Sequence, residues 1–360
     1  MKEHFESKLK ITSKRWLGRC VYSCIYIKNK IQKYMHSAQK RISPPKNRPN
    51  LVTVTAKRWK IISAVLIILL GIYYGIGGAI SSRFNNKLDV PPKTNLTIGQ
   101  HTLAALTYVL KAQVNDTAWT PALPIIFQAS VLDNLPNFQL GVKDSANYFI
   151  KHIARNGQNE KLKEAANLLD YPANIWLFSK DQKDKISPGS AKQYRKAWAN
   201  LKTILTKNEN YLPLTDENFL SLLNDSILLI NKKIAVLNKH ILEHSSELSD
   251  FKADDFFYQT QGCLYTLHYL LSAVTKDFRQ QILDNDQYEN MTTVLHLLTE
   301  AMEIKPISVK NASLNNIYNA NHLAYLTAYL SQAQSKLQEI YYTILLKNTE
   351  QPTCPSSEKE

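Results

Sequence analysis

The stretch FLSLLNDSILLINKKIAVLNKHIL, residues 219–242, places an apolar side chain at every third or fourth position. This alternation of threes and fours keeps those side chains on one face of an α-helix, where they form a continuous seam. The stretch therefore predicts a long helix that packs along one side. The seam positions are Phe219, Leu223, Ile227, Ile230, Ile234, Leu237 and Ile241.

The helical period continues over most of the chain after residue 84. Long patterns lie at 256–283, 290–302 and 316–346, and shorter ones at 98–114, 144–155, 160–169 and 190–206. No run alternates apolar and polar residues for long enough to indicate a sheet. Proline-containing stretches at 118–143 and 170–189 interrupt the helices, and their apolar content predicts that they pack against the body. We therefore expect residues 84–350 to form an all-α, multi-helix bundle, followed by a disordered tail over 351–360.

The net charge of the chain is concentrated at its N-terminal end. The whole sequence has 44 Lys and Arg against 30 Asp and Glu, a net charge of +14. Residues 1–60 contain 16 of the basic residues and only two acids, Glu3 and Glu6, so the remaining chain is electrically balanced. A nucleic-acid-binding domain is expected to carry a basic face on its folded part. This charge distribution therefore argues against a nucleic-acid partner.

An uncharged stretch of 22 residues, IISAVLIILLGIYYGIGGAISS, occupies positions 61–82. A helix of about 20 apolar residues spans the hydrocarbon core of a bilayer, so residues 59–83 are predicted to form a single transmembrane helix. Basic residues are denser before this stretch than after it, which places the N-terminus in the cytoplasm. The body would then lie on the far side, which is the periplasm of a bacterium with a single-pass protein in its inner membrane.

The basic arm, residues 1–58, has two interpretations of equal weight. Apolar residues between 8 and 36 fall near helical spacing among Lys and Arg, which is typical of an amphipathic helix lying on anionic lipid. The alternative is a disordered basic tail that only sets the orientation of the membrane helix. Within that helix, Gly71-x-x-x-Gly75 is a small-residue pattern that lets two helices approach closely.

Three segments of the body resemble a known family. They are LDNLPNFQLGV at 132–142, DDFFYQTQGCLYTLHYLLSAVTKDF at 254–278 and ANHLAYLTAYLSQAQSKLQEI at 320–340, with a weaker match in NIWLFSK at 174–180. They are similar to an uncharacterised family of Gram-negative inner-membrane proteins, domain of unknown function 2333 (DUF2333). The resemblance covers roughly residues 90–345 and implies one N-terminal membrane helix followed by a helical body. It implies no activity and no catalytic residues.

The sharpest chemical motif is HILEH at 240–244, which matches the inverted zinc-peptidase pattern H-x-x-E-H. His240 and His244 lie one helical turn apart and would bind Zn²⁺, with Glu243 as the general base. No third ligand is identifiable. The alternative interpretation is an ordinary helix end, at which Ile241 and Leu242 face the core and the three polar residues are solvated. We favour the second, and assign no catalytic, cofactor or metal residues.

Other residues with chemical potential have structural interpretations. His268 and His296 lie in apolar patterns and are predicted to be core or boundary residues. Asn321–His322 is predicted to bond the loop at 132–142. Asp254–Asp255 is predicted to cap a helix. Cys263 and Cys354 are not expected to pair. Eight tyrosines are predicted to pack in the core or, as an alternative, to line a groove for a peptide, glycan or lipid. They are Tyr258, Tyr265, Tyr269, Tyr318, Tyr325, Tyr329, Tyr341 and Tyr342.

Three functional hypotheses follow from these observations. The first is a membrane-anchored, non-enzymatic scaffold or binding module of the cell envelope, with a protein partner on the far side. The second is a membrane-anchored zinc hydrolase that uses His240, Glu243 and His244. The third is a homo-oligomer that associates through the seam at 219–242.

Overall fold

The computed structural model describes residues 51–81, 88, 96–124, 126–127, 134–156, 159–180, 186–207, 211–245 and 250–350. The interpretations of residues 8–36, of the tail over 351–360 and of Cys354 lie outside these residues. The chain divides into two compact units, the first ending at Leu69 and the second beginning at Leu70.

Helix α2, Leu51–Ser81, contains the whole uncharged stretch except Ser82. Its side chains are described over residues 59–75, where large apolar residues are exposed on every side of the helix. The structure describes only these 17 side chains of α2. Within the residues that it describes, no helix is long and apolar enough to cross a membrane.

The described part of the body is helical, which confirms the all-α fold class. The helices are α3 (His101–Val114), α4 (Asn134–Asn156), α5 (Glu160–Leu169), α6 (Ser190–Thr206), α7 (Asp216–His244), α8 (Ala253–Asp277), α9 (Arg279–Asp284), α10 (Tyr288–Glu303) and α11 (His322–Glu350), with a 3₁₀ turn η1 at Thr120–Ala122. Two three-residue strands, β1 (Phe178–Lys180) and β2 (Ile186–Pro188), form an antiparallel hairpin. The expectation of no sheet was wrong at this hairpin.

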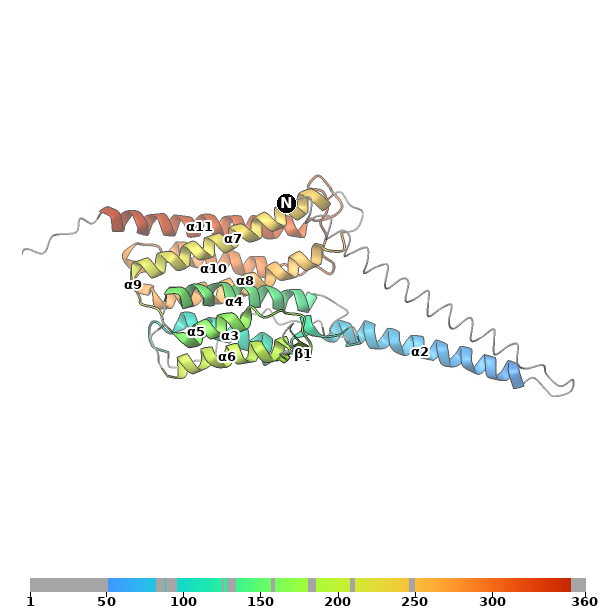
Figure 1. The fold of residues 1–360 in the computed structure, drawn as a ribbon. Helices are drawn as coiled ribbons and strands as arrows, with labels where there is room; N and C mark the ends of the chain where they lie inside the picture. Colours follow the sequence, from blue (N-terminus) through green and yellow to red (C-terminus); the bar gives the residue numbers. More distant parts are fainter. Residues whose placement is uncertain are drawn as a thin grey trace, which may run out of the picture. The chain divides into compact units, whose positions relative to one another are not determined.

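Helix α8 is the centre of the bundle (Figure 1). It packs against α4 and α3 on one side and against α10, α7 and α11 on the other. Helices α5 and α6 cover α4 and α3, and α7 pairs with α11. Because α8 has neighbours on nearly all sides, every residue from Thr260 to Leu267 is buried.

The seam predicted over 219–242 is confirmed in α7. Six of its seven apolar side chains are buried, and Ile234 is partly buried against the core. They pack against α11 and α8 of the same chain.

Helices α4 and α8 touch backbone to backbone at two glycines. A Cβ atom on Gly141 would lie 2.1 Å from the carbonyl oxygen of Gln259, and one on Gly262 would lie 2.1 Å from that of Phe138. Non-bonded contacts of a Cβ atom are essentially never shorter than 3.0 Å. Both positions therefore require glycine, and they bring together the segments at 134–142 and 254–278.

The N-terminus of α3 is capped by a side chain 175 residues further along the chain (Thr102 to Asp277). The buried carboxylate of Asp277, at the end of α8, accepts hydrogen bonds from the backbone N–H groups of Gly99 (2.7 Å), His101 (3.1 Å) and Thr102 (2.8 Å). It also accepts one from the Thr102 hydroxyl at 2.7 Å. These groups have no partner within α3, so Asp277 supplies the acceptor that the helix start lacks.

Two predicted helix starts were wrong. Helix α4 begins at Asn134 instead of 144, so that Pro136 lies in its first turn, where proline is tolerated because the N–H groups have no intrahelical acceptor. Helix α11 begins at His322 instead of 316, and Ile317 is exposed in the preceding loop.

Candidate functional site

A buried polar cluster lies where α7 ends and α8 and α11 begin. His240 Nε2 lies 2.7 Å from Asp250 Oδ2, and both side chains are less than a tenth exposed. Asn311 Nδ2 donates to the same oxygen at 2.8 Å, and the backbone N–H of Lys252 donates to Asp250 Oδ1 at 3.0 Å. Burial acts to raise the pKa of Asp250, but the hydrogen bonds from Asn311, Lys252 and His240 lower it below its usual value.

Asn321 extends this cluster to the first turn of α11. Its side chain donates to Asn311 Oδ1 at 2.9 Å and to the carbonyl of Ala312 at 2.7 Å, and accepts from the N–H of Ala324 at 2.9 Å. His322 Nδ1 accepts the N–H of Lys310 at 2.9 Å, and partial burial lowers the pKa of its imidazole. Asn321 and His322 therefore bond the loop at 310–312, and the predicted contact with residues 132–142 was wrong.

The structure uses the HILEH motif differently from either sequence interpretation. His240 is buried and stacks on Phe256, with ring centroids 4.2 Å apart, instead of being solvated. Glu243 is exposed, and its Oε1 lies 3.9 Å from Nζ of Lys239. Leu242, expected in the core, is 84% exposed. In the parts of the chain that the structure describes, no three His, Cys, Asp or Glu side chains are grouped so that they could hold a metal ion.

The sequence interpretation missed Asp250 as the partner of His240. Asp250 lies ten residues after His240 and outside both helices, so no helical spacing connects the two. The one local signal is its position two residues before Lys252, whose N–H it accepts as aspartate often does at a chain turn.

The remaining histidines have separate environments. His152 of α4 is buried beside Asp225 of α7, with Nδ1 and Oδ2 2.5 Å apart. Burial lowers the pKa of His268 to about 4, so that its imidazole is neutral at pH 7. The side chain of His296 is 70% exposed, so the expectation of a core or boundary residue was wrong.

The acidic pair and the buried cysteine have simple roles. Asp254 and Asp255 lie in the first turn of α8, where the helix dipole favours them, but the capping position is Lys252. Asn137 of α4 donates to Asp255 at 2.5 Å and joins the starts of α4 and α8. Cys263 is a buried, unpaired thiol whose pKa is raised by that burial.

The tyrosines divide between the two predicted roles. Tyr265 and Tyr269 are buried, and Tyr269 packs against Tyr108 with ring centroids 5.2 Å apart. Tyr318, Tyr325 and Tyr342 are exposed. Tyr341 lines a groove between α7 and α11.

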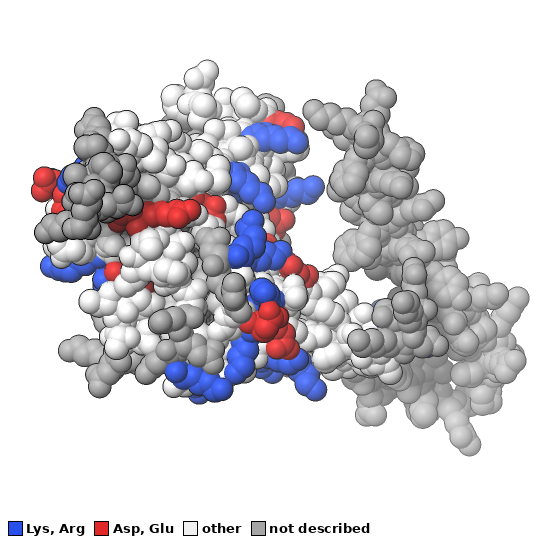
Figure 2. Space-filling model, turned by 60° about the vertical axis from the view of Figure 1, so that its left-hand side comes forward, with Lys and Arg blue, Asp and Glu red and all other residues white. Residues whose placement is uncertain are grey.

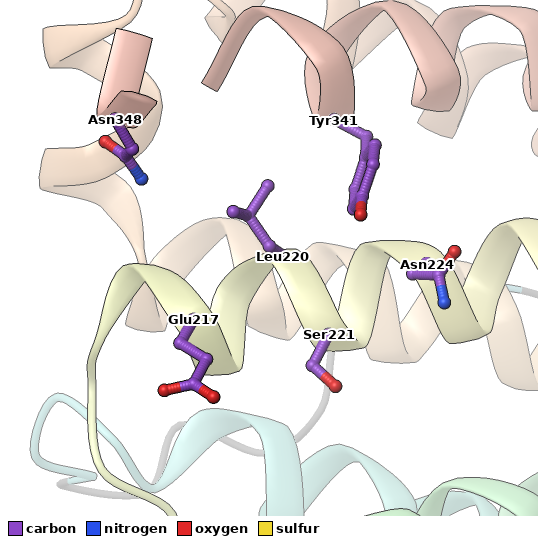
Figure 3. A pocket seen from close by; sticks show the side chains of 6 residues that line it. All are labelled: Glu217, Leu220, Ser221, Asn224, Tyr341 and Asn348. Carbon is purple, nitrogen blue, oxygen red and sulfur yellow. The ribbon is translucent and has the colours of Figure 1, made fainter. Parts of the chain in front are cut away.

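That groove is the candidate binding site (Figure 3). Its volume is about 410 Å³, and it is lined by Glu217, Leu220, Ser221 and Asn224 of α7 and by Tyr341 and Asn348 of α11. The phenol of Tyr341 points from α11 toward α7, while the carboxylate, hydroxyl and amide groups offer both donors and acceptors. These groups suit a polar ligand or a polar side chain of a partner protein.

Basic and acidic side chains lie next to one another on the face shown in Figure 2. This mixture agrees with the balanced charge of the body expected from its sequence. No model of a protein family, no curated protein and no solved structure matches this chain.

Proposed function

We propose that this chain is a single-pass protein of a bacterial inner membrane, with its N-terminus in the cytoplasm and its helical body in the periplasm. The observation that carries the proposal is the uncharged stretch at 61–82 within the 31-residue helix α2. Its apolar side chains are exposed on all sides from 61 to 73, which is unfavourable in water at roughly 25 cal/mol per Å². A lipid environment removes that penalty, and 31 helical residues extend for about 46 Å.

We propose further that the body is a non-enzymatic scaffold or binding module. The support is that the buried polar groups with the most contacts already have structural partners. Asp277 caps α3, and His240 and Asp250 join two helix ends. Gln139 uses both ends of its amide to bind the chain around η1. The groove between α7 and α11 is the surface that we assign to a partner.

The geometry does not favour the two other hypotheses. A zinc hydrolase needs His240, Glu243 and His244 around one ion. However, Glu243 is exposed beside Lys239, and the described residues contain no group of three side chains that could hold a metal ion. An oligomer formed through the seam at 219–242 needs apolar side chains that the body has already buried against α11 and α8.

The test uses the tagged full chain expressed in a Gram-negative host. We expect the chain to stay in the membrane pellet after an alkaline carbonate wash, and external protease to digest the body in spheroplasts but not in intact cells. The matched control is the double variant Leu66→Arg, Leu70→Arg, which we expect to leave the pellet because each central charge opposes insertion by about 2.5–3.5 kcal/mol. A wild-type chain in the wash supernatant, or a body protected in spheroplasts, would contradict the proposal.

The same membranes test the scaffold function. After crosslinking in cells and affinity purification, we expect a specific envelope protein to be recovered with the full chain and lost when residues 96–350 are deleted. Ser221→Arg, in the groove, should weaken recovery, while Lys202→Glu on the exposed face of α6 should not. Recovery of the chain without any partner would count against a scaffold.

The polar cluster gives a second expected result. Asp250→Ala leaves the buried side chains of His240 and Asn311 without their acceptor, so we expect the free energy of unfolding to fall by about 2–4 kcal/mol at pH 7. Chemical unfolding of the full chain in detergent measures this change. Glu243→Gln, three residues from His240 but exposed, is the control and should change stability by less than about 0.5 kcal/mol.

Acid titration separates the charge of Asp250 from its shape. The pKa of Asp250 is lower in the folded chain than in the unfolded chain. Its contribution to the free energy of unfolding is therefore fully present above the ordinary aspartate pKa of about 3.9, and is lost as the pH falls through the folded pKa. The isosteric variant Asp250→Asn should lose less stability than the wild type over this interval. An equal loss of stability on acidification in the wild type and in Asp250→Asn would contradict this prediction.

A further inference from the structure

Four connecting segments meet at one end of the bundle, which we call the loop end (Figure 1). They are residues 115–127, 170–189, 245–252 and 304–321, apart from the positions within them that the structure does not describe. Contacts join them in two pairs: Trp119 Nε1 donates to the carbonyl of Ala173 at 2.8 Å, and Asp250 accepts from Asn311. The starts of α4 and α8 lie between these segments and are joined by Asn137 and Asp255.

Large apolar side chains are strongly exposed on three of these segments, and we call them the apolar tips. Leu177, Phe178 and Ile186 are each at least 60% exposed on the hairpin. Phe251 of residues 245–252, and Ile317 and Tyr318 of residues 304–321, are each at least 85% exposed. Isolated exposed apolar residues are common, but several on segments at one end of a bundle mark an interaction surface.

The loop that carries Ile317 and Tyr318 is held in shape by hydrogen bonds. At its base, Asn311 and Asn321 form an isolated β-bridge beside the Asp250 cluster. At its tip, the side chain of Asn316 accepts the N–H groups of Tyr318 (2.8 Å) and Asn319 (2.9 Å). The two apolar side chains are therefore presented outward by an ordered turn.

We propose that the loop end inserts these apolar tips into the surface of the bilayer that anchors α2, a step that rests on the membrane anchor proposed above. Separate projecting tips fit a fluid lipid interface, which closes around each one, better than a rigid protein face. The four segments together are electrically balanced, with six Lys and six Asp or Glu. Within them, residues 304–321 contain Lys305 and Lys310 and no acid, so the attraction to anionic headgroups is confined to this loop. Tyr318 and Trp176 are residue types that prefer the interface.

The connection to α2 is long enough for this contact. Because residues 97–100 form a turn, the linker is residues 82–96, which can reach at most roughly 50 Å at about 3.3 Å per residue. Helix α8, with 25 residues, has a length of about 38 Å. The linker can therefore pass along the whole body to the start of α3 while the loop end stays at the membrane.

The test places an environment-sensitive fluorophore on single cysteines of the full chain, in a background with Cys20, Cys24 and Cys354 replaced by serine. The chain is reconstituted in vesicles of phosphatidylethanolamine and phosphatidylglycerol that carry a spin label near the top of the acyl chain. We expect blue-shifted emission at Ile317→Cys compared with Leu346→Cys, an exposed site at the opposite end. We also expect the quenching of fluorescence to rise several-fold more steeply with the fraction of spin-labelled lipid at Ile317→Cys, and we call this rise the slope. The Ile317→Cys slope should fall in vesicles without phosphatidylglycerol.

A third reporter, Ile67→Cys in α2, separates the two proposals. Quenching at Ile67→Cys but not at Ile317→Cys would leave the anchor in place and overturn the inference about the loop end. Absence of quenching at both sites would overturn the anchor itself. A blue shift at Ile317→Cys that no lipid-attached quencher reduces would show burial against a second copy of the chain, and would also overturn the inference.

Discussion

Gly262→Ala is expected to lower the free energy of unfolding of the body by at least about 3 kcal/mol, at the upper end of what overpacking usually costs. The new Cβ atom would lie 2.1 Å from the carbonyl oxygen of Phe138, which belongs to a helix backbone and cannot rotate away. Helices α4 and α8 must separate, and the side chains packed along both of them lose contact. The helix preference of alanine over glycine, about 1 kcal/mol, is too small to offset this loss.

Urea unfolding of the full chain in detergent, followed by circular dichroism, measures the effect. Gly71→Ala is the matched control, because it makes the same change within a helix at a position where a Cβ atom meets nothing within 4 Å. The double variant Gly141→Ala, Gly262→Ala should cost less than the sum of the single changes, since helices already separated by one methyl group admit the second more easily. A Gly262→Ala protein as stable as the wild type would contradict the close packing.

Asp277→Ala is expected to lower the free energy of unfolding by about 3–5 kcal/mol, the range found when one partner of a buried charged contact is removed. The substitution leaves the backbone N–H groups of Gly99, His101 and Thr102 without their acceptor. Tyr211 lies close by: its hydroxyl accepts the N–H of Leu103, and burial together with the charge of Asp277 raises its pKa. The loss is therefore centred on the first turn of α3.

Amide hydrogen exchange locates this effect, with urea unfolding for its size. We expect the amides of Thr102 and Leu103 to exchange much faster in Asp277→Ala than in the wild type. Asp284→Asn changes an exposed carboxylate at the same end of the bundle and should leave exchange in α3 unchanged. Equal protection of α3 in Asp277→Ala and the wild type would mean that the carboxylate does not hold this helix start.

Some sequence predictions failed where a local rule has two outcomes. The prolines at 118–143 predict a break between helices, but Pro136 falls in the first turn of α4, the one place where a helix accepts proline without losing a hydrogen bond. The pattern at 316–346 continued the period of α11 backward through Ile317. Asn321 ends that continuation because its side chain accepts the N–H of Ala324 and caps the helix.

Other predictions failed because a helical period does not specify which face is buried at the end of a helix. His240 and Leu242 are two residues apart on α7, and the structure buries the first and exposes the second. Asp250 decides this, since its carboxylate receives His240. A hairpin of three-residue strands is likewise too short to produce a pattern that sequence reasoning can detect.

The sequence by itself determined the helical class, the seam of α7, the uncharged stretch at 61–82 and the concentration of positive charge before it. Each of these depends on composition or on spacing within one turn or two, so it is present in the chain before any folding. Only the tertiary structure decided that Gly141 and Gly262 face each other and that Asp277 caps α3. It also decided that His240 binds Asp250 and that apolar loop tips gather at one end. These contacts depend on where separate segments meet, which the packing of whole helices around α8 determines.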